Sequence, residues 1–260
     1  MTLDLPRYGA RIGYSGGWSV DLKTLRNVHL AHATSIPFEN LDVLLGRPVR
    51  LDLQSLWAKL VEGGRGGYCF EQNALLAAVL EEVGFRVTRL AARVRMGATG
   101  VRPRSHMLLA VEAEGEEWIA DVGFGGMGLL RPIRLRGGEV EECLGWRHRV
   151  AVEGDLNVLQ AAGPTGDWVD QYAFTLEPQY PVDYEVSNHF TSTYPESIFR
   201  KMLMVQKAGE CRVLLQNRRL IEQRPEGSKE AAVEGDEGLR EVLGERFGLW
   251  VEEGTRFGVE

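Results

Sequence analysis

Apolar side chains recur at helical spacing through the first third of the chain. Leucine or valine stands at positions 22, 25, 28 and 30, in a segment that ends before Pro37. Asp52 is placed to cap a second helix that Gly63 would end, and a third helix is predicted from about Phe70 to Val83. These patterns predict a helical region over the first third of the chain.

The pattern changes at Arg86 to short segments in which apolar and polar positions often alternate. Examples are RVTRLAARVR, which begins at Arg86, and EEWIADVG, which begins at Glu116. Turn residues separate these segments, and such alternation is typical of half-buried β-strands. The middle of the chain therefore predicts a β region, either a barrel or a sandwich.

The last third mixes both kinds of pattern. A helix is predicted at about 196–204, a strand in CRVLLQN and another helix near EGLREVLGERFG. Residues 222–238, EQRPEGSKEAAVEGDEG, are so polar that we expect a mobile loop there. The chain as a whole predicts an α+β fold.

Composition and charge narrow the class of protein. The 260 residues are 44% hydrophobic and carry a formal net charge of −7, with the arginines scattered along the chain. We therefore expect a soluble protein without a nucleic-acid or membrane partner. The N-terminus lacks an apolar signal segment and no apolar run approaches the ~18 residues of a membrane span, so we expect a cytoplasmic location.

Cysteine chemistry is concentrated in the stretch EGGRGGYCFEQN, residues 62–73. Cys69 follows two glycine pairs and stands at the predicted start of the third helix, where unpaired amide N–H groups favour a thiolate. The glycines allow a tight turn and leave space for a substrate beside the sulfur. The alternative is a buried structural cysteine. The chain has three cysteines and no CxxC pair, so neither a disulfide framework nor a zinc site is predicted.

A thiol nucleophile needs a base, and His106 is the best placed of the five histidines. His106 lies at the start of the predicted strand SHMLLAVEA, and the strand EWIADVG would return after a turn at Glu114 and Gly115. In such a hairpin, two residues face each other when their numbers sum to 229. Leu108 would then face Asp121, which becomes a diagonal neighbour of His106 at ~7–8 Å between Cα atoms. Taken singly, His106 could be an ordinary strand histidine and Asp121 an ordinary turn residue. Taken together with Cys69, the two residues predict a Cys-His-Asp constellation.

His29 and His32 have the spacing of a metal-ligand pair on one helix face. No third ligand stands near them in the sequence, and a zinc site needs at least three. We therefore predict no metal site.

At these residues the chain resembles the arylamine N-acetyltransferase family. The motifs that carry the resemblance occur in family order over about residues 8–205. They are ARIGYSG, HATSIPFENLDVLLGRPVRLD, RGGYCFEQN, RSHMLLAV, WIADVGFGG and SNHFTSTYPESIF.

The resemblance implies three parts: a helical bundle over 1–85, a central antiparallel β-barrel over 86–185 and a C-terminal α/β lid over 186–260. It also implies a cysteine-protease-like core, in which Cys69 of RGGYC, His106 of RSHM and Asp121 of IADVGFGG form the catalytic triad. The implied activity is ping-pong acetyl transfer from acetyl-coenzyme A to arylamines, hydrazines and arylhydroxylamines, a reaction of xenobiotic metabolism. No metal takes part.

The resemblance also implies binding residues. Coenzyme A contacts are expected at Arg102, Arg104, Gly125 and Gly126, although surface arginines are often only solvated and the glycines could form a bulge. Glu39 and Arg65 match family positions and are expected to form a supporting ion pair. A set of mostly aromatic residues is expected to line the acceptor pocket, and ordinary core packing is the alternative for each. These residues are Phe38, Tyr68, Val94, Phe124, His189 and Phe190.

Three other functions remain open at this point. One is a relative that closes a macrolactam on a polyketide acyl chain, and another is a papain-like or transglutaminase-like thiol enzyme. The third is a binding module that has lost its chemistry, which the intact Cys69, His106 and Asp121 argue against. The sequence predicts neither the preferred amine nor the oligomeric state.

Overall fold

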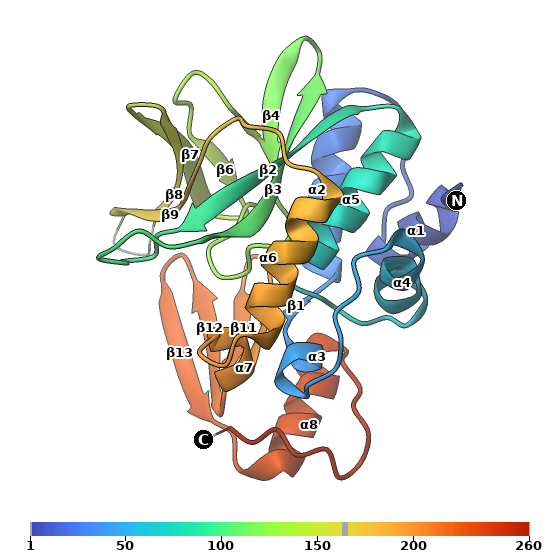
Figure 1. The fold of residues 1–260 in the computed structure, drawn as a ribbon, viewed down its shortest axis with the longest axis vertical. Helices are drawn as coiled ribbons and strands as arrows, with labels where there is room; N and C mark the ends of the chain where they lie inside the picture. The colour runs from blue at the N-terminus through green and yellow to red at the C-terminus, as the bar shows by residue number, and fades with distance from the viewer. Residues whose placement is uncertain (1, 163–165, 260) are drawn as a thin grey trace.

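Two antiparallel sheets and a group of helices make up the fold (Figure 1). The computed structural model of the chain describes residues 2–162 and 166–259. The helices are α1 Leu5–Ile12, α2 Leu22–Ser35, α3 Leu41–Leu44, α4 Leu53–Leu56, a π-helix Trp57–Glu62, α5 Cys69–Val83, α6 Pro181–Thr193, α7 Ile198–Lys201 and α8 Gly235–Phe247. In the described part of the chain, none of these is long and apolar enough to span a membrane.

The strands divide between the two sheets. The barrel sheet has eight strands in the order β5-β4-β3-β2-β9-β8-β7-β6, and the lid sheet has five in the order β1-β10-β11-β12-β13. The strands are β1 Phe38–Glu39, β2 Arg86–Val94, β3 Arg104–Ala113, β4 Glu116–Ala120, β5 Ile133–Arg134, β6 Glu141–Cys143, β7 Trp146–Glu153, β8 Leu156–Ala162, β9 Trp168–Phe174, β10 Met204–Lys207, β11 Arg212–Gln216, β12 Arg219–Arg224 and β13 Gly227–Ala232.

The helices of the first third form where the apolar pattern predicts them. Asp21 and Asp52 each accept a backbone N–H of the first turn, so α2 and α4 begin with side-chain caps. Helix α1 was not predicted. Its own signals are the Asp4 cap and Gly13, which ends the helix in the left-handed region.

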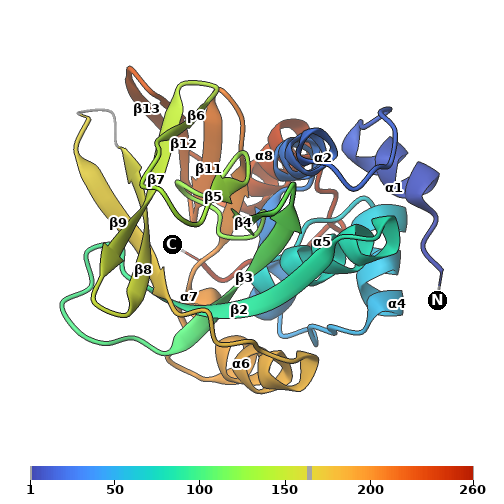
Figure 2. The same cartoon turned by 90° about the horizontal axis from the view of Figure 1, so that it is seen from above.

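The barrel sheet curls until β5 lies against β7 (Figure 2). Leu109 pairs with Ala120, which confirms the predicted register. Strand β3 is buried on both faces: Leu108 belongs to the barrel core, and Met107 and Leu109 pack with the helical core. The barrel is therefore nearly closed, and one side of it is covered by α2 and α5.

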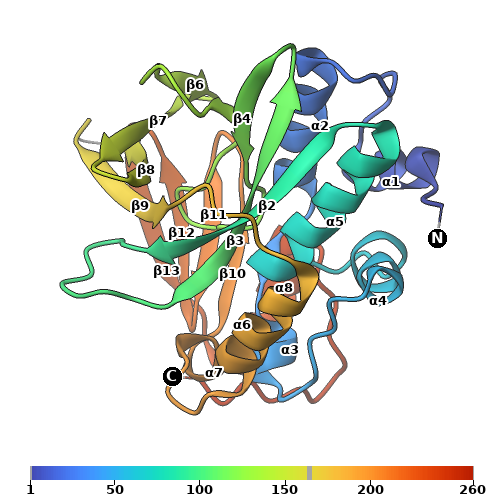
Figure 3. The same cartoon turned by 45° about the horizontal axis from the view of Figure 1, so that its top comes forward.

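The lid sheet includes a strand from the helical region, because Phe38 of β1 pairs with Gln206 of β10. Helix α8 packs on this sheet through Leu239, Leu243 and Phe247. Helix α6 packs beside α5, where Tyr184 meets Phe70 (Figure 3). The predicted boundary between residues 185 and 186 falls inside α6.

The predicted mobile loop at 222–238 is wrong. Its first part forms a hairpin of β12 and β13, and its last residues begin α8. Strand β13 is an edge strand with exposed side chains, so backbone hydrogen bonds form it without an apolar pattern. The helix predicted at 196–204 exists as the shorter α7.

Candidate active site

Three separate elements bring the predicted nucleophile, base and acid together. Cys69 is the first residue of α5, His106 lies near the start of β3, and Asp121 follows β4. Nε2 of His106 lies 2.7 Å from Oδ2 of Asp121, and Sγ of Cys69 lies 3.8 Å from the carbonyl oxygen of Ser105, the residue before His106. All three side chains are buried. The close approach of the predicted diagonal pair follows from the register of β3 and β4.

Charge stabilises the protonated form of the histidine. Burial alone would lower the pKa of His106, but the Asp121 carboxylate, together with Cys69, raises that pKa to about 10. Burial works in the opposite direction on Asp121, yet His106 and further hydrogen bonds hold the pKa of its carboxyl below the usual range. The two residues therefore form an imidazolium-carboxylate pair next to the sulfur.

Asp121 is fixed by more than His106. Its Oδ1 accepts hydrogen bonds from Nδ2 of Asn73 at 2.9 Å and from the amide of Gly123 at 3.0 Å. Its own backbone N–H donates to Nε2 of His29 at 3.0 Å. Sequence reasoning missed Asn73, although its place four residues after Cys69 puts both on one face of α5. It gave no supporting role to His29.

The loop after Asp121 fits closely against the backbone of Cys69. A Cβ atom on Gly123 would lie 2.6 Å from Cα of Cys69, so only glycine fits there. On Gly125 it would lie 2.7 Å from Oε1 of Gln206, which also accepts the amide of Gly126. At both glycines, the close neighbour is therefore another part of the protein chain. Coenzyme A binding by Gly125 and Gly126 stays a prediction.

Aromatic side chains gather beside the site. The ring of Phe124 lies 5.0 Å from that of His106, and Phe124 and Phe38 both line a cavity of about 30 Å³. Phe199 packs against Phe38 and Tyr68, with ring centroids 6.3 and 5.7 Å apart. Sequence reasoning missed Phe199, which is the last residue of the motif SNHFTSTYPESIF.

The other predicted acceptor residues lie elsewhere. Phe190 is 44% exposed on α6 and stacks on Tyr194, and His189 lines a groove of about 760 Å³ between α5 and α6. Val94 lines a separate cleft of about 780 Å³ that also contains Arg102 and Arg104. The structure thus groups Phe38, Tyr68 and Phe124 but not these three. Their binding roles stay predictions.

The cleft with Arg102 and Arg104 is rich in arginine. Arg104 is paired with Glu177 at 2.6 Å, and Arg95 is paired with Asp170 at 2.8 Å. Arg102 is exposed, and its carbonyl oxygen accepts a hydrogen bond from Arg93. A phosphate bound here would therefore have to compete with Glu177 for Arg104 and with Asp170 for Arg95.

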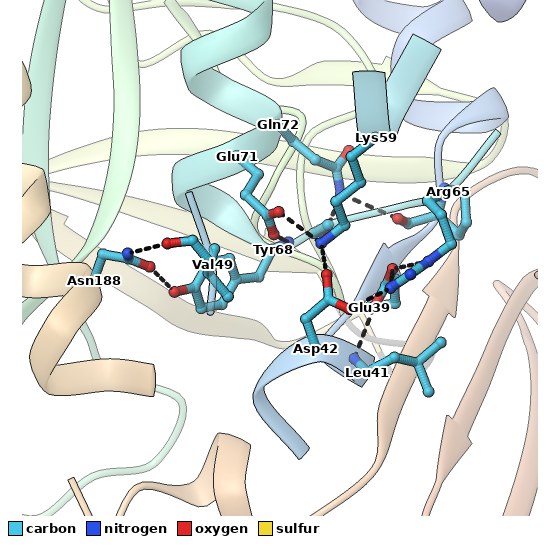
Figure 4. Close-up of polar contacts among 12 residues, drawn as sticks. Glu39, Leu41, Asp42, Val49, Lys59, Arg65, Tyr68, Glu71, Gln72 and Asn188 are labelled. Carbon is cyan, nitrogen blue, oxygen red and sulfur yellow. Dashed lines mark hydrogen bonds and ion pairs between the residues drawn. The ribbon is translucent and has the colours of Figure 1, made fainter. Parts of the chain in front are cut away.

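A buried charge network holds the N-terminal end of α5 (Figure 4). The predicted ion pair forms, with Nη2 of Arg65 2.6 Å from Oε1 of Glu39. Nζ of Lys59 lies 2.6 Å from both Asp42 and Glu71, and Glu71 accepts the Tyr68 amide at 3.0 Å. The network therefore reaches Tyr68, the residue before Cys69. On the other side, the Tyr68 hydroxyl donates to Asn188 of α6.

His29 and His32, whose spacing is that of a metal-ligand pair, take part in hydrogen bonds of the helical core. The described residues contain no group of three or more His, Cys, Asp or Glu side chains that could hold a metal ion. Nδ1 of His29 lies 3.1 Å from the carbonyl oxygen of Leu130, and Nδ1 of His32 lies 2.7 Å from the Tyr8 hydroxyl. Both histidines make hydrogen bonds inside the helical core.

Comparison with known proteins identifies the family. The sequence model of a family described as N-acetyltransferase matches residues 21–256. The arylamine N-acetyltransferase of Escherichia coli (strain K12) is 47% identical over 206 residues, which cover 79% of this chain and 73% of that protein. The chain belongs to the arylamine N-acetyltransferase family. It is therefore an enzyme of the acetyltransferase class, as the motifs predict.

Two further relatives extend the comparison. One, from Salmonella typhimurium, is named "Arylamine N-acetyltransferase / N-hydroxyarylamine O-acetyltransferase" and is 39% identical over 79% of this chain and 73% of its own. The other is the solved structure of the Mycobacterium marinum arylamine N-acetyltransferase in complex with CoA. It is 39% identical and has a TM-score of 0.89, over 94% of this chain and 92% of its own. The fold of the chain is the fold of the family.

Proposed function

We propose that the protein transfers an acetyl group from acetyl-coenzyme A to the nitrogen of arylamines and hydrazines, and to the oxygen of arylhydroxylamines, through an acetyl-Cys69 intermediate. The observation that carries the proposal is the Cys69-His106-Asp121 arrangement at the start of α5, in a chain of this family. Its chemistry is that of a thiol activated by a charged base.

In the first half-reaction, the Cys69 thiolate attacks the thioester carbonyl of the donor. A bond forms between the sulfur and the acetyl carbon, and the bond from that carbon to the sulfur of coenzyme A breaks. The leaving thiolate takes the proton held by His106, so free coenzyme A leaves as a thiol. His106 ends this half neutral, hydrogen-bonded to Asp121.

In the second half-reaction, the acceptor nitrogen attacks the acetyl-cysteine. His106 takes the proton that the nitrogen loses, the bond between the acetyl carbon and Sγ breaks, and the Cys69 thiolate is restored beside an imidazolium. Asp121 holds the ring throughout and stabilises its charge in the free enzyme, which is why its pKa and that of His106 are shifted in opposite directions.

Two regions are proposed for the substrates. A flat acceptor ring suits the aromatic side chains of Phe38, Tyr68, Phe124 and the neighbouring Phe199. Acetyl-coenzyme A as donor is supported by the Mycobacterium marinum relative, whose solved structure is a complex with CoA. The cleft of Arg102 and Arg104 is the place proposed for its phosphates.

The test uses the purified chain, acetyl-coenzyme A and a panel of arylamines and hydrazines, with release of free thiol as the readout. We expect steady thiol release that depends on the amine, and one acetyl group on Cys69 by intact-mass analysis when amine is omitted. The Cys69→Ala variant should stay folded and lose both signals. Turnover retained in folded Cys69→Ala would rule out the mechanism.

A further inference from the structure

His29 lies completely buried in the middle of α2, directly under the loop that carries Asp121. Both of its ring nitrogens are engaged with backbone groups. Nδ1 lies 3.1 Å from the carbonyl oxygen of Leu130, and Nε2 lies 3.0 Å from the backbone nitrogen of Asp121. Leu130 stands 9 residues after Asp121 in the sequence, so the one ring connects both ends of this loop.

These two partners determine the state of the ring. A carbonyl oxygen can only accept a hydrogen bond and an amide N–H can only donate one, so Nδ1 must carry the proton and Nε2 must not. Burial lowers the pKa of His29 to about 4, which keeps the ring neutral at neutral pH. His29 is therefore a fixed acceptor for the amide of Asp121.

The position of that amide matters because the Asp121 carboxylate makes three separate hydrogen bonds. His106 binds one oxygen, and Asn73 and Gly123 bind the other, all at 2.7 to 3.0 Å. Asp121 lies just beyond the last paired residue of β4, so the barrel sheet does not pair its N–H. Without His29, this N–H would be buried without an acceptor, and the loop would move to satisfy it.

We propose that His29 is a positioning residue of the active site, which holds the backbone of Asp121 so that its carboxylate meets His106. This inference rests on the proposed function, because it gives Asp121 its catalytic role. His29 itself does not touch the reacting atoms.

Two substitutions separate the two hydrogen bonds of His29. The carboxamide of His29→Asn reaches as far as Nδ1 and can keep the bond to Leu130, but it cannot reach the Asp121 amide. The longer carboxamide of His29→Gln reaches as far as Nε2 and can accept that amide. We expect the turnover rate of the Asn variant to fall about 10- to 100-fold, since misplacing a reacting group by ~1 Å costs about 100-fold. The Gln variant keeps an acceptor for the Asp121 amide and so keeps the carboxylate in place, so its turnover rate should stay within about threefold of wild type.

A second readout does not depend on the acetyl donor or the acceptor. Iodoacetamide alkylation of Cys69, followed by mass mapping, reports how well His106 and Asp121 stabilise the thiolate. At mildly acidic pH we expect alkylation to be slower in His29→Asn than in wild type and restored in His29→Gln. A purely structural role would change stability without separating the two variants in this profile.

The matched control is Tyr8→Phe, which removes the buried hydrogen bond to His32 on the same helix without touching the Asp121 loop. We expect it to lower the free energy of unfolding and to leave the Cys69 alkylation profile unchanged. Equal turnover and equal alkylation in folded His29→Asn and wild type would overturn the inference. A wild type that alkylates rapidly but never acetylates Cys69 would contradict the proposed function instead.

Discussion

At the scale of single residues, backbone groups orient the chemistry of the site as much as side chains do. Asp121 binds one amide through its carboxylate and offers its own amide to His29, while Asn73 of the nucleophile helix reaches both Asp121 and the amide of Val122. The aspartate therefore has little freedom to rotate. His106 receives a carboxylate whose position is already fixed.

Asp121→Asn tests the charge of that carboxylate with little change in shape. The amide leaves His106 without a negative partner and favours the wrong tautomer, so turnover should fall by about 10⁴-fold, close to the loss in His106→Ala. Steady-state kinetics with acetyl-coenzyme A and one arylamine would measure this loss. A near-normal rate in folded Asp121→Asn would show that the carboxylate has no catalytic part.

Local turn chemistry made much of this site predictable from the sequence. Glu114 and Gly115 both adopt positive φ, as a two-residue hairpin turn requires, and this turn sets the pairing that brings Asp121 to His106. The roles of Asn73 and His29 were not predictable in this way. Asn73 is 48 residues and His29 is 92 residues away from Asp121 in the sequence. Such contacts exist only once the barrel packs on the helices.

At the scale of elements, a π-helix places a lysine beside the start of α5. Residues Trp57–Glu62 continue α4 with a wider turn, and the amide of Gly63 binds the carbonyl oxygen of Ala58, five residues earlier. This turn carries Lys59 between Asp42 and Glu71 (Figure 4). A single half-buried lysine therefore links α3, the π-helix and the start of α5.

Lys59→Met tests this link. The substitution would leave the Asp42 carboxylate without its lysine and, above the Glu71 pKa of about 7, the Glu71 carboxylate as well, so we expect the free energy of unfolding at pH 8 to fall by about 3–5 kcal/mol. Adding Glu71→Gln should recover part of the loss, because glutamine is neutral and its oxygen can still accept the Tyr68 amide. Urea denaturation of the single and double variants measures both effects. Equal stabilities of Lys59→Met and wild type would contradict a structural role for the network.

Helix α6 shows why some elements escaped prediction from the sequence. Its buried residues are Tyr184, Asn188 and Thr191, which follow helical spacing but are polar or amphipathic. Its valines at positions 182 and 186 are exposed instead. The apolar residues of α6 therefore lie on its exposed face and do not indicate the buried one. Hydrogen bonds such as that from the Tyr184 hydroxyl to the carbonyl oxygen of Leu90 fix the buried face.

At the scale of the whole molecule, the helical region and the two sheets meet around the loop that follows Asp121. Arg212 of the lid sheet is buried, donates to the carbonyl oxygens of Gly126 and Gly128, and lies 4.6 Å from the ring of Trp146. Burial lowers its pKa to about 9, still well above neutral. The lid sheet thus fixes the same loop that His29 fixes from the helical side.

The protein interior also contains uncharged histidines, and one of them, His29, lies beneath the loop of Asp121. Burial lowers the pKa of His29 to about 4, of His32 to about 3 and of His148 to about 4. Near pH 5 the folded protein keeps these rings neutral, whereas the unfolded chain protonates them at its ordinary value near 6.5. Their stabilising effect is present above that value and is lost as the pH falls towards 4.

Glu71 acts in the opposite direction. Its burial raises the pKa to about 7 although Lys59 opposes this, so the folded state holds its proton up to neutral pH. The unfolded chain loses that proton near 4.5, so this contribution is present below 4.5 and is lost as the pH rises through 7. Together, the three histidines and Glu71 predict that unfolding near pH 5 takes up about two protons.

The free energy of unfolding should therefore fall by about 2–3 kcal/mol when the pH drops from 6 to 5, since each proton is worth ~1.4 kcal/mol per pH unit. Urea denaturation at the two pH values, at constant ionic strength, measures the slope. Glu71→Gln is the control: it removes the opposing proton, so the fall should steepen to about 4 kcal/mol, the value for three protons. Unchanged stability in wild type between pH 6 and 5 would mean that the buried histidines do not stay neutral in the folded state.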